Sequence, residues 1–246
     1  MIYRIMHLSA GLSARIGRIA GSLRRAPASL ACCVIVLGIH LLAVKAGQSG
    51  LPGPWYETFG LSRAGFLSGK AWQLMSYGLL HGSWWHAGLN ALFVLSIGPR
   101  IEAITGSGAM VRAMLAGVLA GGLCHLLLGS GLLVGLSGGC VALLLLLTTL
   151  SPQSRMLPLP VSGKSLGLGI MAAEFLLALG DPALGLPVVA VAGRWLAAHG
   201  MESWFRVGHA CHFGGGLAGW LYGCWLLRSR VTLEQLRRAR ARREAR

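Results

Sequence analysis

Charge is what this 246-residue chain most conspicuously lacks. Charged residues make up 12% of it and hydrophobic residues 54%, whereas soluble domains carry about 25% charged residues. A soluble protein needs polar residues to cover its apolar core, and this chain has too few of them. The composition therefore excludes an ordinary soluble domain and predicts a membrane protein with several spans.

Acidic residues are scarcer still, with 7 Asp and Glu against 22 Lys and Arg and a net charge of +15. Such a surplus can indicate nucleic-acid binding, but here it is concentrated in two places. Five arginines lie within residues 1–26 and eight within 228–246. Basic segments beside apolar spans are typical of the cytoplasmic side of a membrane, where anionic lipids attract them. We therefore expect the lipid bilayer, not nucleic acid, as a partner.

The N-terminal segment has two interpretations. Residues 1–25 contain arginines and serines but no acid, which fits a mitochondrial transit peptide. It also fits a basic arm on the inner membrane face, which we favour because the basic C-terminal tail marks the same side. We expect an arm at 1–26, a membrane domain at 27–227 and a tail at 228–246. The expected location is the inner membrane of a bacterium, with both termini cytoplasmic.

Patterns for metal binding are also missing. The six cysteines form no CxxC pair or zinc spacing, and we interpret them as small buried hydrophobic residues. No HExxH occurs, although four histidines could together ligate zinc: His81, His86, His209 and His212. The acids that we place near them are Glu57, Asp181 and Glu202, and none forms a carboxylate base beside paired histidines. We expect neither a metal nor an organic cofactor.

Long apolar runs are abundant. A helix needs about 20 apolar residues to cross a bilayer, and six candidate segments occur, at roughly 27–46, 76–98, 108–129, 137–150, 165–181 and 207–227. Six crossings place both termini on one side, in agreement with the basic tails. No repeat of about 20 to 50 residues is present, so the spans form one all-α domain.

The connections differ in character. The connection at 47–75 is long and contains Trp and Tyr, which is typical of an element in the headgroup layer of the membrane. Residues 99–107 and 151–164 are short and basic, hence cytoplasmic. Residues 182–206 lie on the opposite side, where a mobile cap and a linking loop are both compatible with the sequence.

The fourth span is too short to cross the bilayer. Residues 137–150 make about 21 Å of helix at about 1.5 Å per residue, against a hydrocarbon core of about 30 Å. Ser137 should therefore begin its helix about 10 Å below the outer surface, with residues 130–136 as irregular backbone above it. Irregular backbone at that depth must be buried in protein or line a cavity. The sequence thus predicts a cavity at Ser137.

Three polar clusters fall in the same leaflet. They are His81, His86 and Asn90 in the second span, Ser137 in the fourth, and His209 and His212 in the last. Each alone has an ordinary explanation, because serines and histidines in membranes commonly pack or bond between helices. Their common depth favours a site instead. A serine, a histidine base and an amide are the groups that acyl transfer uses.

These residues resemble the rhomboid family of intramembrane serine proteases. The family's motifs read here as His81, His86 and Asn90 (HxxxN after a histidine), Glu102, Gly106 and Ser107 (ExxxGS), Gly135, Ser137 and Gly138 (GxSG), and His212, Gly215 and Gly219 (HxxGxxxG). They occur in the family's order between residues 72 and 219. The resemblance implies a six-helix bundle with a short central fourth helix.

The resemblance also implies roles. Ser137 would be the nucleophile and His212 the general base, as a dyad without a third carboxylate. His86 and Asn90, with the Ser137 backbone N–H, would form the oxyanion hole. His81 would help to hold water in the pocket.

Four glycines also fit the pattern of the rhomboid family, and two residues differ from it. Gly215 and Gly219 would let the last helix approach the fourth, while Gly135 and Gly138 leave room for irregular backbone and close helix contact. Many rhomboids have Trp-Arg where this chain has Trp72-Gln73, and often a tyrosine that stacks on the catalytic histidine where it has Val141.

The implied activity is cleavage of peptide bonds in or near the transmembrane segments of membrane protein substrates. The alternative is a rhomboid-like pseudoprotease that binds membrane helices without cutting them. A transporter with a polar midplane site is a third possibility, although inverted-repeat symmetry is not evident.

Overall fold

The computed structural model describes residues 21, 24–48, 53–155 and 160–228. The predicted arm at 1–26 and tail at 228–246 therefore lie almost entirely outside the described residues. Throughout the described part the chain is helical, with two isolated β-bridges and no strand. The all-α prediction is confirmed.

Six helices make the bundle: α2 (Pro27–Lys45), α6 (Trp84–Thr105), α7 (Ser107–Leu128), α8 (Ser137–Leu150), α9 (Gly163–Gly180) and α11 (His209–Leu226). In the described part of the chain, α2, α6, α7 and α9 are long and apolar enough to cross a membrane. α8 is a shorter apolar helix. α11 is as long as α9, but its histidines and glycines make it less apolar. The protein is an integral membrane protein.

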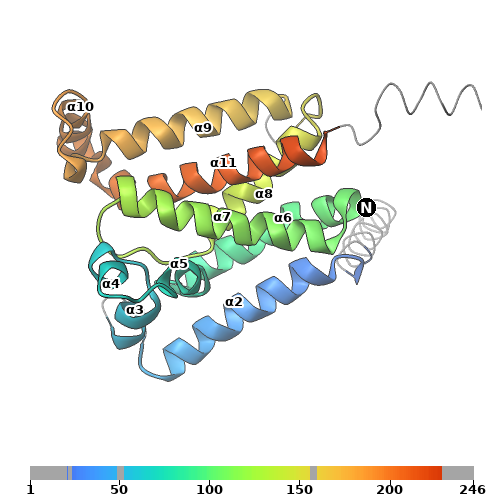
Figure 1. Ribbon diagram of the computed structural model, residues 1–246, viewed down its shortest axis with the longest axis horizontal. Helices are drawn as coiled ribbons and strands as arrows, with labels where there is room; N and C mark the ends of the chain where they lie inside the picture. Colours follow the sequence, from blue (N-terminus) through green and yellow to red (C-terminus); the bar gives the residue numbers. More distant parts are fainter. Residues whose placement is uncertain (1–20, 22–23, 49–52, 156–159, 229–246) are drawn as a thin grey trace, which may run out of the picture.

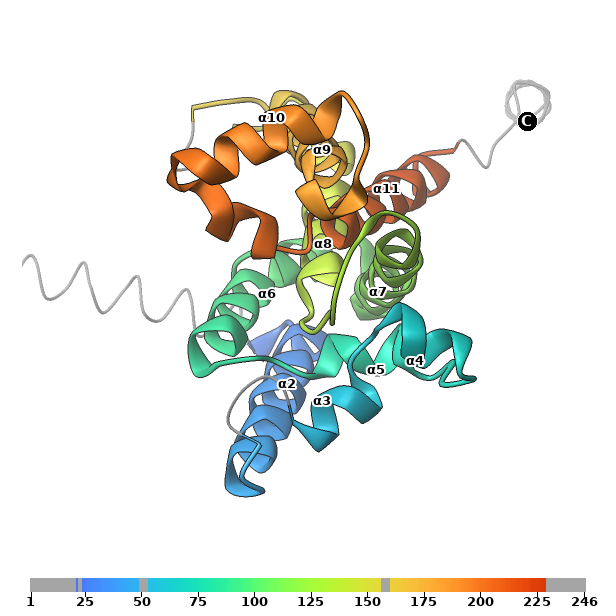
Figure 2. The same ribbon diagram turned by 90° about the vertical axis from the view of Figure 1, so that its left-hand side faces the viewer.

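The short fourth helix of the bundle, α8, lies at its centre. Figures 1 and 2 show α8 enclosed by its neighbours, and it contacts α6, α7, α9 and α11. Leu143 and Leu146 on it are fully buried. The predicted bounds 137–150 agree with α8 residue for residue.

The second span differs from its predicted range of 76–98. α6 begins only at Trp84. Ser83 caps its N-terminus, because the Ser83 hydroxyl accepts a hydrogen bond from the His86 N–H at 3.1 Å. At its other end it continues to Thr105, so that Gly106, with φ +84°, alone joins it to α7. Hydropathy falls after residue 98 because Pro99, Arg100 and Glu102 follow. The helix itself does not end at that point.

Glu102 ties the start of α2 to the α6–α7 corner. Its buried carboxylate accepts hydrogen bonds from the Ser29 N–H (2.8 Å) and hydroxyl (2.6 Å), the Ala28 N–H (3.2 Å) and the Ser107 hydroxyl (2.6 Å). A carboxylate at this place satisfies N–H groups that a helix N-terminus leaves free. The motif Glu102, Gly106 and Ser107 thus fixes one end of the bundle.

The first long loop folds into α3 (Pro54–Phe59), α4 (Arg63–Leu67), α5 (Gln73–Ser76) and a 3₁₀ turn at Tyr77–Leu79. Gln73 is fully buried and holds the loop together. Its amide donates to the carbonyls of Glu57 (3.1 Å) and Thr58 (3.3 Å) and accepts from the Ser62 N–H (3.3 Å). A neutral amide therefore anchors the loop at the position where many relatives of the predicted family carry arginine.

The connection 182–206 is largely helical. It contains α10 (Val189–Leu196) and short helical turns at Pro182–Leu184, Ala197–Met201 and Glu202–Arg206. α10 packs against α9, as Figure 2 shows. The interpretation as a plain linking loop is therefore wrong, because the segment has a helical structure of its own.

Candidate functional site

A cavity of about 740 Å³ opens where α8 begins. Its walls include residues from each of the predicted polar clusters, namely His86, Asn90, Ser137, His209 and His212. The prediction of a cavity at Ser137 is confirmed. The distant sequence segments are brought together because α6, α8 and α11 pack against one another.

Ser137 is the first residue of α8 and is half-buried. The preceding residue, Leu136, supplies no side-chain cap. The first N–H groups of a helix lack intrahelical partners and carry the positive end of its dipole. The hydroxyl of Ser137 therefore stands beside backbone donors that can bind a negative charge.

Hydrogen bonds hold the irregular backbone before Ser137. Leu133 and Leu61 exchange both of their backbone hydrogen bonds, at 2.8 and 2.9 Å. The Gly135 N–H donates to the Tyr77 carbonyl at 2.9 Å. These bonds satisfy the backbone of a segment that lines the cavity, as irregular backbone inside a membrane bundle requires.

Gly135 fits its position for two reasons. Its φ of +115° is a conformation that favours glycine. In addition, a Cβ atom here would lie 2.6 Å from both Nε2 and Cε1 of His86. The missing side chain thus leaves the space into which the His86 ring projects, beside the backbone that leads to Ser137.

Asn90 lies one turn after His86 on α6 and is buried. Its Nδ2 donates to the His86 carbonyl at 3.2 Å, and its Oδ1 accepts from the Cys140 thiol at 3.4 Å. These contacts fix the orientation of the amide at the cavity wall. A primary amide has two N–H donors, so one of them is left for a molecule in the cavity.

His81 does not line the cavity, so the prediction that it lies in the pocket is wrong. It is 1% exposed, and its Nε2 accepts a 3.4 Å hydrogen bond from the Leu136 N–H. Its ring meets that of His86 edge to face at 4.9 Å between centroids. The structure therefore places His81 behind the wall, where it supports the His86 ring and the backbone next to Ser137.

The predicted packing glycines bring α11 against α8. A Cβ atom on Gly215 would overlap the carbonyl oxygen of Gly138, and one on Gly219 would overlap that of Ala142. The two helix backbones are thus in direct contact along this face. This contact carries His212 to the cavity wall, close to the start of α8.

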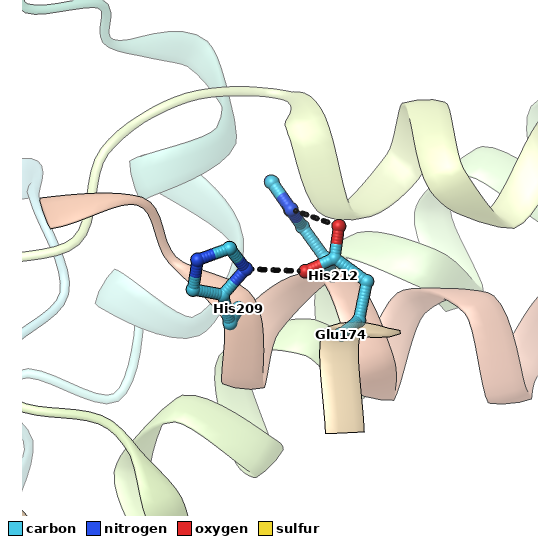
Figure 3. A group of neighbouring side chains, drawn as sticks. All are labelled: Glu174, His209 and His212. Carbon is cyan, nitrogen blue, oxygen red and sulfur yellow. Dashed lines mark hydrogen bonds and ion pairs between the residues drawn. The ribbon is translucent and has the colours of Figure 1, made fainter. Parts of the chain in front are cut away.

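An acidic residue that the sequence analysis missed lies beside His212. Oε1 of Glu174, on α9, is 3.1 Å from His212 Nδ1 (Figure 3). The resemblance implies a dyad without a third carboxylate, whereas here a carboxylate lies within hydrogen-bond distance of the histidine. Glu174 does not stand out in the sequence because it lies inside the apolar run 165–181. A lone acid inside a membrane span is nevertheless a functional candidate in its own right, and this signal was present in the sequence.

The sequence also matches the model of a protein family. Residues 68–229, well over half of the chain, match the Rhomboid domain. The chain belongs to the rhomboid family. The match begins before α5 and covers every residue of the candidate site, whereas α2 lies outside it. A comparison with curated proteins finds no match.

In this rhomboid, Glu174 bridges two histidines of α11. Its Oε2 is 2.6 Å from His209 Nδ1, and His209 Nε2 is 2.8 Å from the Trp204 carbonyl oxygen. Figure 3 shows both imidazole rings turned toward the one carboxylate. The side chains of the three residues are 11 to 18% exposed.

The same three residues are close enough to hold a metal ion, because their ligand atoms lie within 4.8 Å of one another. This set differs from the four histidines considered from the sequence, since it lacks His81 and His86. The separations of 2.6 and 3.1 Å are those of direct hydrogen bonds. In this geometry the Nδ1 atom of each histidine is hydrogen-bonded to one carboxylate oxygen of Glu174.

Ser137 and His212 both face the cavity, and within the described residues no hydrogen bond joins them. Val141, at the position where rhomboids often have tyrosine, packs beside α11, since a Cβ on Gly216 would lie 3.2 Å from Val141 Cγ1. An aliphatic side chain cannot orient an imidazole by a polar contact. In this rhomboid the polar contact to His212 comes from Glu174.

Proposed function

We propose that this protein is an intramembrane serine endopeptidase that cleaves peptide bonds in or near the transmembrane segments of other membrane proteins. The observation that carries the proposal is the cavity. It brings the hydroxyl of Ser137, the imidazole of His212 and the polar groups of His86 and Asn90 together inside an all-helical membrane bundle. These groups serve acyl transfer without any cofactor.

In the proposed reaction, Ser137 Oγ attacks the carbonyl carbon of the scissile peptide bond while His212 Nε2 accepts the hydroxyl proton. The imidazolium then gives this proton to the leaving amine, and an ester between Ser137 and the substrate remains. Water from the cavity attacks the ester, with His212 again acting as the base. Hydrolysis releases the acid and restores the serine.

The negative charge that develops on the carbonyl oxygen needs donors. The Ser137 N–H at the uncapped start of α8 supplies one. The His86 ring and the remaining N–H of the Asn90 amide come from α6 and line the same cavity. Donors held by helices before the reaction begins are effective, because little reorganisation is needed when the charge appears.

A pseudoprotease that binds membrane helices without cutting them is the second candidate. Two observations favour it: no hydrogen bond joins Ser137 and His212, and Val141 replaces a stacking tyrosine. Against it, catalytic hydrogen bonds are often long before substrate binds. All the residues of the proposed chemistry also line one cavity.

A fluorophosphonate probe separates the two candidates, since it reacts with an activated serine whatever the substrate is. The full-length protein, reconstituted in liposomes, is expected to be labelled, and Ser137→Ala is expected to remain unlabelled. If the folded wild-type protein shows no Ser137-dependent labelling, the pseudoprotease is the correct assignment.

We also propose that the protein resides in the inner membrane of a bacterium with both termini cytoplasmic. Support comes from the basic residues near the two ends of the chain and from the six-helix bundle between them. Reporter fusions at the two termini test this orientation. Periplasmic activity of either fusion would contradict it.

A further inference from the structure

A base that accepts a proton from Ser137 must have a free lone pair on the nitrogen that faces the serine. Neutral imidazole carries one proton, which can sit on either nitrogen. His212 therefore acts through Nε2 only if its proton is held on Nδ1. The side chain of Val141 has no hydrogen-bond acceptor, so the group that holds this proton has to be another one.

Glu174 meets this requirement. An ionised carboxylate only accepts hydrogen bonds, so Oε1 at 3.1 Å from His212 Nδ1 keeps the proton on Nδ1. The pair is largely shielded from water, with side-chain exposures of 13 and 18%. Shielding strengthens the interaction and reduces competition from water.

His209 supplies the charge that an ionised Glu174 needs. Both of its ring nitrogens face acceptors, with Glu174 Oε2 at 2.6 Å and the Trp204 carbonyl oxygen at 2.8 Å. With an ionised Glu174, both nitrogens must donate, so this geometry corresponds to an imidazolium. A lone carboxylate within a membrane protein is costly, whereas a carboxylate paired with a cation is tolerated.

The helices that carry these groups are packed at the same level. The rings of Phe175 on α9 and Phe213 on α11, each adjacent in sequence to Glu174 or His212, lie 4.9 Å apart. One turn further along α11, Gly216 leaves room for Met171 of α9. Packed helices hold side chains more accurately than loops do, so Glu174 has a defined position against His212.

We propose that Glu174 is a positioning residue for His212, with His209 as its counter-charge. This inference rests on the proposed serine protease function and extends the Ser137–His212 pair to a serine–histidine–glutamate arrangement. When Ser137 attacks, its proton moves to His212 Nε2. Glu174 stays ionised and stabilises the resulting imidazolium through Nδ1.

The test measures fluorophosphonate labelling of the full-length protein in liposomes at several probe concentrations, which separates the limiting rate kinact from the apparent affinity KI. Glu174→Gln is expected to lower kinact at least tenfold with KI little changed, since removal of an orienting carboxylate can cost up to about 10⁴ in rate. Glu174→Asp keeps the charge but shortens the side chain by one methylene group, so its kinact should fall severalfold and lie between those of wild type and Glu174→Gln. Glu57→Gln, at an exposed position on α3, is the matched control and should behave as wild type.

The outcomes are distinguishable. Wild-type kinact in a folded Glu174→Gln protein overturns the inference and leaves the protease proposal intact. Zinc that copurifies with the wild type, is lost in Glu174→Gln and is needed for labelling would also overturn it, because the three residues would then be metal ligands. Absent labelling of the wild type overturns both proposals. If Glu174→Gln does not fold, Glu174→Asp decides: a severalfold fall in kinact supports the inference, and an unchanged kinact contradicts it.

Discussion

The ring of His86 lies against the backbone of Gly135, two residues before Ser137, and a Cβ atom at position 135 would come within 2.6 Å of it. His86, a proposed oxyanion donor, can therefore take this position only because residue 135, in the connection before α8, has no side chain. Two segments of the chain meet at this point, namely the start of α6 and the irregular backbone before α8, and both border the cavity.

Gly135→Ala is expected to impair the site. The added methyl group meets the His86 ring, and alanine at a φ of +115° is strained. We expect a loss of about 1–3 kcal/mol in the free energy of unfolding and slower fluorophosphonate labelling. Gly88→Ala on α6 is the control, because a Cβ there meets no atom within 4 Å and alanine favours helix. Equal behaviour of the two variants would contradict the account.

Asn90→Ala is expected to slow the reaction less than loss of the nucleophile does. Removal of one oxyanion donor typically costs about 2.7–4 kcal/mol, or about 10²–10³ in kcat. Cleavage kinetics on a reconstituted single-span substrate measure this. Ser96→Ala, on the same helix and exposed, should leave kcat unchanged. A kcat in Asn90→Ala equal to that of wild type would remove Asn90 from the oxyanion hole.

Gly219→Ala tests the contact between α11 and α8. The new Cβ would overlap the Ala142 carbonyl oxygen, and overpacking of this kind typically costs about 1–3 kcal/mol. Thermal unfolding in detergent should show a lower midpoint. Gly169→Ala, at an exposed position on α9 without a neighbour within 4 Å, should not lower it. An unchanged midpoint in Gly219→Ala would mean that the helices can move apart freely.

The sequence was sufficient to predict α8 and the cavity. The apolar run 137–150 has polar or glycine residues at both ends, and its length alone predicts that Ser137 lies below the membrane surface. The limits of α6 were harder to predict. Hydropathy reports where a helix enters and leaves the membrane, whereas the Ser83 cap and the Gly106 turn decide where it begins and ends.

The motifs located the residues around the cavity but not all of their partners. Glu174 does not stand out in the sequence because α9 is apolar enough to span a membrane in spite of it, and its contact with His212 joins residues that are 38 positions apart. The place of His81 behind His86 depends on how the loop folds beneath α8. Contacts of this kind follow from helix packing, which a single sequence does not specify.

The most direct measurement of the central claim compares wild type with Ser137→Ala in cleaving a single-span membrane protein, selected from a coexpressed panel and then reconstituted with the enzyme in liposomes. The account predicts cleavage in or near the span by wild type and none by Ser137→Ala, whose free energy of unfolding should stay within about 1 kcal/mol of wild type because the hydroxyl is not structural. Substantial cleavage by Ser137→Ala, or none by the folded wild-type protein across the panel, would contradict it.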